Sequence, residues 1–510
     1  MEHVAVIDMG SNSIRFMVMR IEDNASFSLQ YQQNEAIRLG KGMRRTGRLN
    51  LEGVERAVEC LRVYSDLIKV MEVDHVIAVA TAAARSAKDG DAFIRRIREE
   101  TGIEVEVISG EREAYLGYLG VVNTIAADDY IQFDLGGASI EVSLVRDRRI
   151  EKSVSVPIGT VTLTDQFALH GTVTPVDMEK CTKFIERAFK ESIPWAKGKR
   201  LPVIGVGGTV RTLAKMDMSK VRYQLSRIHN YVIPYNRFND TYQALIKSSY
   251  GSRKKIRGLS PERADIIAGG AAIIRALLRF SGGRDIIVSG CGLRDGAFYE
   301  YYGEKYGNGS PVVEDVLNFS VQNYLLRTNR RMGHLELVHR LTGSLFEQLP
   351  KLHGADKRAG EILSIAAWLH DAGKIINYYD HARHSAFIIG HAPLYGMTHR
   401  EQLMAAYIAG FHHGISNKTV RSYRYSMMLS QEEWKTVRRL SLLLAIAEAA
   451  DVTYEGFVER LEAEERADAV VLHLLTKDGK HNHRAADLEI QSVAKQCKAE
   501  MGKPLVVVWD

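Results

Sequence analysis

One short stretch of the chain carries the groups that phosphate chemistry needs. An apolar β-forming run ends at Asp134, passes through Gly136, Gly137 and the hydroxyl of Ser139, and resumes as a second alternating run that contains Glu141. This pattern predicts a β-hairpin whose tip exposes backbone N–H groups. Adjacent glycines let the backbone approach an anion, the serine adds a donor, and the two carboxylates are ligands for a divalent cation. The alternative is a plain tight turn, since Asp-Leu-Gly-Gly also forms ordinary hairpins.

A second stretch near the N-terminus repeats this order. Residues 4–19 run from an apolar strand through Asp8, Gly10, Ser11 and Asn12 into another apolar strand. Two such hairpins favour a duplicated architecture, in which both tips face one phosphate-binding cleft. Two more glycine-rich strand ends support this interpretation, at residues 203–209 and 286–296.

An acidic residue lies between the two hairpins in the sequence. Ser109 is a favourable helix N-cap, and the first turn of the helix that it predicts carries Glu111 and Glu113. The helix dipole alone explains acidic residues there. Glu113 also follows a strand end and precedes the Asp134 hairpin, so it is suited to orient a water molecule towards a terminal phosphorus. Arg85 follows another strand end, and it is either a surface residue or a clamp for phosphate.

Composition limits the classes of protein to which the chain belongs. A chain of 510 residues with 45% hydrophobic content is too long for one core and predicts about three domains. A net charge of +6 suits a polyanionic ligand but falls short of a nucleic-acid-binding signature. The four cysteines include no Cys-x-x-Cys pair, which fits a reducing compartment. No secretory segment precedes the first strand and no apolar run spans a bilayer, so we expect a cytoplasmic protein that binds neither nucleic acid nor membrane.

Together the motifs resemble the exopolyphosphatase and guanosine-pentaphosphate phosphatase (Ppx/GppA) family. The resemblance implies an α/β fold with two actin-like, ribonuclease H-like domains, at residues 1–125 and 126–305, and it implies a homodimer. The motifs extend in order over roughly the first three hundred residues and are specific as a set. They are residues 8–13, 80–85, 108–114, 133–141, 157–160, 205–209 and 289–296.

The resemblance also implies roles for individual residues. Glu113 matches the carboxylate that activates or positions the attacking water. Asp8, Asp134 and Glu141 match acidic residues around a Mg²⁺ ion, and Arg85 matches a cationic clamp. The phosphate-binding groups would come from Gly10, Ser11, Asn12, Gly136, Gly137, Ser139, Gly208 and Thr209.

The implied activity is Mg²⁺-dependent hydrolysis of a terminal phosphoanhydride, with a carboxylate assisting the attack of water. The substrate is either inorganic polyphosphate or guanosine pentaphosphate (pppGpp), and the sequence does not choose between them. Two other classes stay open. One is an HD-type metal phosphohydrolase whose front domains only sense polyphosphate. The other is a non-catalytic sensor of a phosphorylated alarmone, against which the presence of Glu113 argues.

The C-terminal part differs in composition. After a glycine- and proline-rich stretch at residues 302–311, which predicts a linker, ten of the seventeen histidines fall between residues 334 and 413. The pattern resembles an HD domain, which implies an all-α domain at residues 312–455. His334, His370 and Asp371 would be ligands of a second divalent metal.

Two further features of this part bear on that assignment. Glu448 lies where HD enzymes usually carry an aspartate, so a helical bundle that has lost its metal site is the alternative. Residues 456–510 predict a small α/β appendage with strand-like runs near residues 469–475 and 505–509.

Overall fold

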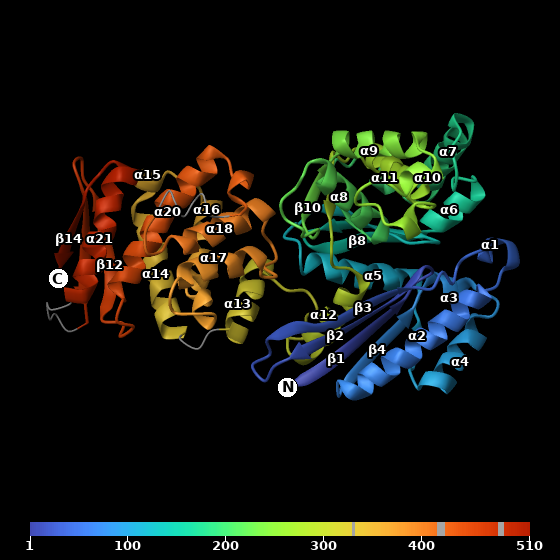
Figure 1. Ribbon diagram of the computed structural model, residues 1–510, viewed down its shortest axis with the longest axis horizontal. Coiled ribbons are helices and arrows are strands. Elements are labelled where there is room, and N and C mark those ends of the chain that lie inside the picture. Colours follow the sequence, from blue (N-terminus) through green and yellow to red (C-terminus); the bar gives the residue numbers. More distant parts are fainter. Residues whose placement is uncertain (329–331, 416–423, 478–483) are drawn as a thin grey trace. The chain divides into compact units, whose positions relative to one another are not determined.

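The chain folds into two compact units, Met1–Val316 and Leu317–Asp510. A computed structural model describes residues 1–328, 332–415, 424–477 and 484–510 (Figure 1). The finer domain boundaries that the sequence suggests, near residues 125 and 455, stay predictions. Among the described helices, none combines the length and apolar character needed to cross a membrane.

The first sheet of unit 1 holds five strands in the order β3-β2-β1-β4-β5. Strands β1, β2 and β3 are antiparallel neighbours, whereas β4 and β5 continue the sheet in parallel with β1. Four helices accompany it in sequence before α5 leads to the second sheet. The elements are β1 (Glu2–Met9), β2 (Ser13–Ile21), β3 (Phe27–Ala36), α1 (Met43–Thr46), α2 (Leu51–Val70), β4 (His75–Ala80), α3 (Ala82–Ser86), α4 (Gly90–Thr101), β5 (Glu106–Val107) and α5 (Gly110–Val122).

Capping residues in the sequence determine where helices α2 and α5 begin. The side chain of Asn50 accepts a hydrogen bond from the Gly53 amide, 2.8 Å away, and so caps α2. The apolar face of α2 is buried, and its Tyr64 ring stacks on Phe16 of β2 at 4.6 Å between centroids. Ser109 caps α5 in the same way, because its hydroxyl accepts a hydrogen bond from the Arg112 amide. The helix cap predicted at Ser109 is therefore confirmed.

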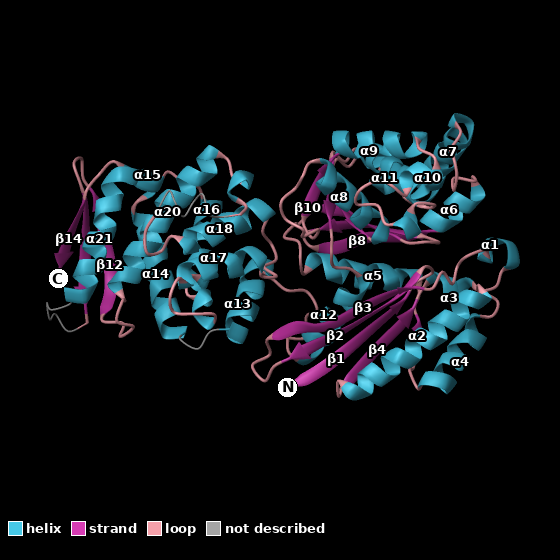
Figure 2. Cartoon of the chain, in the orientation of Figure 1, coloured by secondary structure: helices cyan, strands magenta, loops and turns pink. Residues whose placement is uncertain are grey.

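The second sheet of unit 1 repeats the topology of the first. Its order is β10-β11-β9-β6-β7-β8, so β6, β7, β8, β9 and β11 occupy the places of β1 to β5, and β10 adds an antiparallel edge. Figure 2 draws the strands of the protein in magenta. The predicted duplication is thus visible in the fold. The strands are β6 (Tyr130–Leu135), β7 (Ile140–Arg146), β8 (Arg149–Val156), β9 (Val203–Val206), β10 (Tyr231–Pro234) and β11 (Asp285–Val288).

The helices of this second half surround one large apolar core, to which α11 contributes most of its length. They are α6 (Thr160–Gln166), α7 (Pro175–Ser192), α8 (Gly208–Lys220), α9 (Tyr235–Lys247), α10 (Tyr250–Arg253), α11 (Ile267–Ser281) and α12 (Leu293–Lys305), with short 3₁₀ turns at Pro194–Ala196 (η1) and Pro261–Arg263 (η2).

Helix α12 runs into the stretch that we expected to be a linker. It continues to Lys305, and the Tyr302 hydroxyl donates a hydrogen bond to the carbonyl of Ala25, 2.8 Å away. Gly303 is buried so closely against the following chain that a Cβ there would lie 2.4 Å from the Ser310 carbonyl oxygen. This glycine allows close packing, so the predicted linker begins several residues too early.

Unit 2 consists of a group of helices followed by a three-stranded sheet in the order β12-β13-β14. Strand β12 was not predicted, because it is rich in glutamate and buries only two of its eight side chains fully. The elements are α13 (Val316–Thr328), α14 (Met332–Gln348), α15 (Pro350–His353), α16 (Lys357–Leu369), η3 (Ala372–Ile375), α17 (His381–His391), α18 (His399–Gly410), η4 (Ser426–Met428), α20 (Gln431–Ala450), β12 (Val458–Glu465), β13 (Val470–Thr476), α21 (Arg484–Met501) and β14 (Leu505–Trp509).

Candidate functional site

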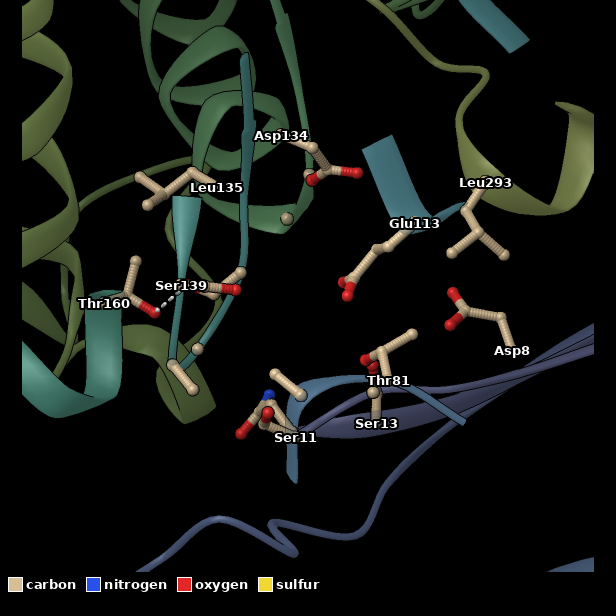
Figure 3. Close-up of a pocket in the computed structure, with 18 of the residues that line it drawn as sticks. Asp8, Ser11, Ser13, Thr81, Glu113, Asp134, Leu135, Ser139, Thr160 and Leu293 are labelled. Carbon is tan, nitrogen blue, oxygen red and sulfur yellow. Dashed lines mark hydrogen bonds between the residues drawn. The ribbon is translucent and has the colours of Figure 1, made fainter. Parts of the chain in front are cut away.

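The tips of the two matching hairpins line one pocket in unit 1. The β1–β2 tip and the β6–β7 tip contribute to it together with the first turns of α5 and α8. Figure 3 shows Glu113 pointing into this pocket, with Asp8 and Asp134 nearby. The predicted residues that line it are Asp8, Gly10, Ser11, Asn12, Glu113, Asp134, Gly136, Gly137, Ser139 and Gly208.

Both hairpin tips close with the same backbone hydrogen bond. The Gly10 amide donates to the Ser13 carbonyl and the Gly136 amide donates to the Ser139 carbonyl, each at 3.0 Å. Within the part of the chain that the structure describes, the amide N–H groups inside both turns have no acceptor. These belong to Ser11, Asn12, Gly137 and Ala138. Successive unpaired N–H groups at a tight turn form a concave donor site for anions.

The segment at residues 157–160 supports the second tip from behind. The amide of Thr160 donates to the Gly136 carbonyl at 3.0 Å, and the amide of Val161 donates to the Gly137 carbonyl at 2.8 Å. A Cβ at Gly159 would lie 2.3 Å from the Gly137 oxygen, so only glycine permits this approach. The tip is therefore held rigidly before any ligand binds, which favours recognition.

The pocket gathers several carboxyl groups, and the nearby arginines offset their burial and mutual repulsion only in part. Burial, together with the nearby Glu141 and Asp134 carboxylates, raises the pKa of Glu113 to about 9, while Arg85 opposes the shift. Burial likewise raises the pKa of Asp134, against the attraction of Arg15. The donor set consists of carboxylates in an anion-binding pocket, which is the environment that suits Mg²⁺. The residues present thus fit the expected ion.

Three predicted residues lie outside the pocket lining. Arg85 donates to the Ile108 carbonyl at 2.6 Å and lies 3.4 Å from the Glu113 carboxylate. Arg85 therefore contacts Glu113 instead of reaching the pocket. Glu141 is 3% exposed and accepts hydrogen bonds from the hydroxyls of Ser139, at 2.7 Å, and Ser155, at 2.8 Å. Thr209 is buried against α11.

Two arginines in the pocket were not predicted. Arg15 pairs with Asp8 across the β1–β2 register, and its guanidinium lies 3.1 Å from the Asp8 carboxylate. Equal spacing of the two residues from the turn is a sequence signal that would have found this pair. Arg263 lines the pocket from η2, a short turn far along the chain, and it has no comparable signal.

A second, strongly cationic pocket adjoins the first in unit 1. The two share Arg15, Gly208 and Arg263. The second pocket adds Arg211, Lys215, Arg294 and the amides of residues 32–34. Burial, together with the neighbouring Arg15, Arg294 and Arg263, lowers the pKa of Arg211 to about 10. Crowded guanidinium groups with too little counter-charge are suited to a polyanion.

Unit 2 gathers the predicted metal ligands into one buried group. Ligand atoms of His334, His370, Asp371 and Glu448 all lie within 4.8 Å of one another, and a second group comprises His381, His412 and His413. The longer glutamate side chain reaches the centre, because Glu448 Oε2 lies 2.9 Å from His370 Nε2 and 3.0 Å from His334 Nε2.

Comparison with known proteins identifies the family. Residues 17–304 match the model of the Ppx/GppA phosphatase family, and residues 328–490 match the model of Ppx/GppA phosphatase domain III. The chain belongs to the Ppx/GppA phosphatase family. The second match describes most of unit 2 as a Ppx/GppA domain III, whereas its assignment as an HD domain stays a prediction.

Ppx/GppA relatives of known structure agree with the fold of unit 1. A crystal structure of the Aquifex aeolicus family member is 30% identical, with a TM-score of 0.53, over 60% of this chain and 99% of that one. An exopolyphosphatase from Cytophaga hutchinsonii is 29% identical, with a TM-score of 0.55, over 59% of this chain and 98% of that one. The chain therefore has the mixed α/β, actin-like Ppx/GppA fold.

One relative of similar sequence is a longer protein. The bifunctional 3-dehydroquinate synthase/phosphatase of Fusobacterium nucleatum is 31% identical over 297 residues. The match covers 56% of this chain but only 44% of the relative, so this chain spans less than half of that protein's length. Membership of the family indicates a phosphatase, and the choice of substrate rests on the site itself.

Proposed function

We propose that unit 1 is an exopolyphosphatase, which hydrolyses the terminal phosphoanhydride of inorganic polyphosphate and releases orthophosphate. The observation that supports this proposal most directly is that Glu113 points into a pocket lined by two hairpin tips whose N–H groups are unpaired. A terminal phosphate seated on these donors has its charge spread over fixed dipoles, which favours attack on phosphorus. In its ionised form, which bound cation would favour, the Glu113 carboxylate accepts the proton of the attacking water as the new P–O bond forms and the bridging P–O bond breaks.

The other residues prepare this step. Asp8 and Asp134 would hold the Mg²⁺ ion, which supplies positive charge near the phosphate oxygens. Glu141 holds the Ser139 hydroxyl in a fixed orientation and so rigidifies the second tip. Arg85 fixes the Glu113 side chain through its contact with the carboxylate. Arg15 does the same for Asp8, and its guanidinium also borders both pockets.

The adjoining cationic pocket supports polyphosphate over pppGpp. A polymer continues as a row of phosphates beyond the terminal group, and the arginines of the second pocket are placed to receive them. A guanine base would instead be expected to stack on a ring. Among the described residues that line either pocket, none is aromatic. Hydrolysis of pppGpp is the second candidate, since its 5′ end presents the same terminal anhydride.

Replacement of Arg211 tests this choice. We expect Arg211→Gln to raise KM for long-chain polyphosphate about tenfold with little change in kcat, because a charge-assisted hydrogen bond contributes roughly 1.5–3 kcal/mol. Orthophosphate release from polyphosphate and from pppGpp is the assay. Lys220→Gln is the control, because Lys220 is exposed on the same helix and lies outside the pocket lining. A higher kcat/KM for pppGpp than for polyphosphate in the wild type would contradict the proposal.

A further inference from the structure

We propose that a basic loop of unit 1, residues 37–48, binds the distal part of a long polyphosphate chain whose terminal phosphate occupies the pocket. The basic loop is thus a second phosphate-binding site beside the first. This inference rests on the exopolyphosphatase activity proposed above, and it predicts a preference for long chains over short ones.

The basic loop carries positive charge that no acidic partner neutralises. Residues 36–51 include five basic residues and no acidic one. Lys41, Arg45 and Arg48 are exposed, and so is Lys88, whose ammonium nitrogen would lie 3.6 Å from a Cβ at Gly47 in the loop. Within the described ranges, none of these four side chains forms an ion pair. Unpaired charges of one sign on one surface attract ligands of the opposite sign.

The fold holds the basic loop in a fixed conformation. Helix α1 at its centre lies between Gly42 and Gly47, which have φ values of 74° and 68° and so take the left-handed conformation that favours glycine. The amide of Lys88 donates to the Gly47 carbonyl at 2.9 Å. Apolar side chains anchor the loop and the residue that follows it, and these are Ile37, Leu39 and Leu49. Cations displayed on an ordered loop lose less entropy when they bind a ligand.

The basic loop packs directly on the first hairpin tip. The Gly40 amide donates to the Ser11 carbonyl at 2.9 Å, and the amides of Ile37 and Arg38 both donate to the Asn12 carbonyl at 3.0 Å. The amides of Ser11 and Asn12 are among the donors inside the tip that have no acceptor. The tip therefore directs its carbonyls to the basic loop, and the loop is the segment next to the terminal-phosphate site. In Figure 1, α1 lies beyond the end of the first sheet.

Arg38 connects the basic loop to the second, cationic pocket. Its guanidinium lies 3.2 Å from the carbonyl of Glu262, which lines that pocket. Gln33 and Asn34 of β3 line the same pocket and lead directly into the loop. Arg38 has a φ of 54°, a strained conformation for a residue with a long side chain, and such conformations cluster at functional sites. The positively charged surface thus continues from the second pocket through Arg38 to the loop.

The chemistry of polyphosphate matches this surface. Every unit of the polymer carries negative charge, and exposed lysine and arginine side chains bind such a chain by displacing its counterions. A long chain has many units left to contact the basic loop after its end has entered the pocket, whereas tripolyphosphate has almost none. The loop should therefore strengthen the binding of long chains alone.

Binding of long-chain polyphosphate to the protein in EDTA tests the proposal, since Mg²⁺-dependent hydrolysis then does not consume the ligand. The triple variant Lys41→Gln/Arg45→Gln/Arg48→Gln should raise Kd about tenfold at low salt. The slope of log Kd against log salt concentration should fall by about two, because each contact with a single-stranded polyanion contributes about 0.7. The Kd for tripolyphosphate should stay unchanged.

Two control variants separate charge at this site from fold and from net charge. Exchanging lysine and arginine at the three loop positions retains the charge and should retain the wild-type Kd. A matched triple variant removes the same charge from exposed positions on and just after α7, outside both pocket linings, and should also bind as wild type; it is Lys180→Gln/Lys190→Gln/Lys197→Gln.

Three results would overturn the proposal. They are an unchanged Kd for long-chain polyphosphate in the loop variant, an equal loss of affinity in the α7 variant, and an equal loss for tripolyphosphate. Orthophosphate release in Mg²⁺ is measured alongside. A wild type that releases none from polyphosphate would contradict the proposed exopolyphosphatase activity, while the comparison of Kd values would still decide whether the basic loop binds the polymer.

Discussion

Replacing Glu113 by glutamine should stabilise the metal-free protein at neutral and alkaline pH. Folding raises the pKa of this carboxyl from 4.5 to about 9, first through burial and then through Glu141 and Asp134. The folded chain therefore holds a proton that the unfolded chain releases between these pH values. Since the folded state binds more protons there, the stability contributed by this group is greatest at low pH and falls as pH rises.

The size of the effect follows from the shift. Between the two pKa values, each pH unit lowers the free energy of unfolding by about 1.4 kcal/mol. A rise from about pH 6 to about pH 8 therefore lowers it by at most about 2.7 kcal/mol. Because Glu141 shares the charge, we expect roughly 2 kcal/mol for Glu113 itself. Glu113→Gln removes this loss of stability, so the difference in free energy of unfolding between the variant and wild type should grow with pH. For a unit of this size the difference corresponds to a few degrees in melting temperature.

Differential scanning calorimetry in EDTA measures the effect. Wild type, Glu113→Gln and the control Glu111→Gln are compared at the two pH values, because Glu111 lies exposed in the same first turn of α5. Addition of Mg²⁺ should reduce the difference in melting temperature between Glu113→Gln and wild type, since bound cation compensates the ionised carboxylate. If the melting temperatures of all three proteins changed with pH by the same amount, the reasoning would be refuted, because Glu113 would then ionise in the folded protein without loss of stability.

Two further predictions concern the stability of unit 1. Gly296→Ala should lower the free energy of unfolding by about 1–3 kcal/mol or more through overpacking, because its Cβ would lie 1.8 Å from a carbonyl oxygen of α5. Gly251→Ala, with open space around its Cβ, should leave the melting temperature nearly unchanged. Arg253→Met should cost about 3 kcal/mol by leaving buried acceptors unpaired, since Arg253 is fully buried and donates to several carbonyls. Arg279→Met, at an exposed position, is its control, and equal urea midpoints for the two variants would contradict this account.

The parts of the fold that depend on local chemistry could be predicted from the sequence. Asn50 and Ser109 cap helices because their side chains satisfy amides within the next turn. The two glycine turns were recognisable because each lies between apolar strands, and their repetition correctly predicted a duplicated architecture, which the two matching sheets show. In each case the interacting groups lie a few residues apart.

The parts that depend on distant packing could not be predicted. Arg263 reaches the pocket from a turn more than a hundred residues beyond the second hairpin. Glu141 has the expected place in the sequence, but its side chain turns towards Ser139 and Ser155, because β8 lies beside β7. Gly303 looks like a linker residue until the chain that packs on it is known. Strand register and close packing decide these features.

The central claim is that the Glu113 carboxylate in unit 1 drives the hydrolysis of polyphosphate. It is tested most directly by Mg²⁺-dependent orthophosphate release from long-chain polyphosphate by wild type, Glu113→Gln and Glu111→Gln. General-base assistance contributes about 10²–10⁴ in rate, so kcat should fall by that factor in Glu113→Gln and stay unchanged in Glu111→Gln. A Glu113→Gln enzyme that keeps its kcat within about tenfold of wild type would contradict the account.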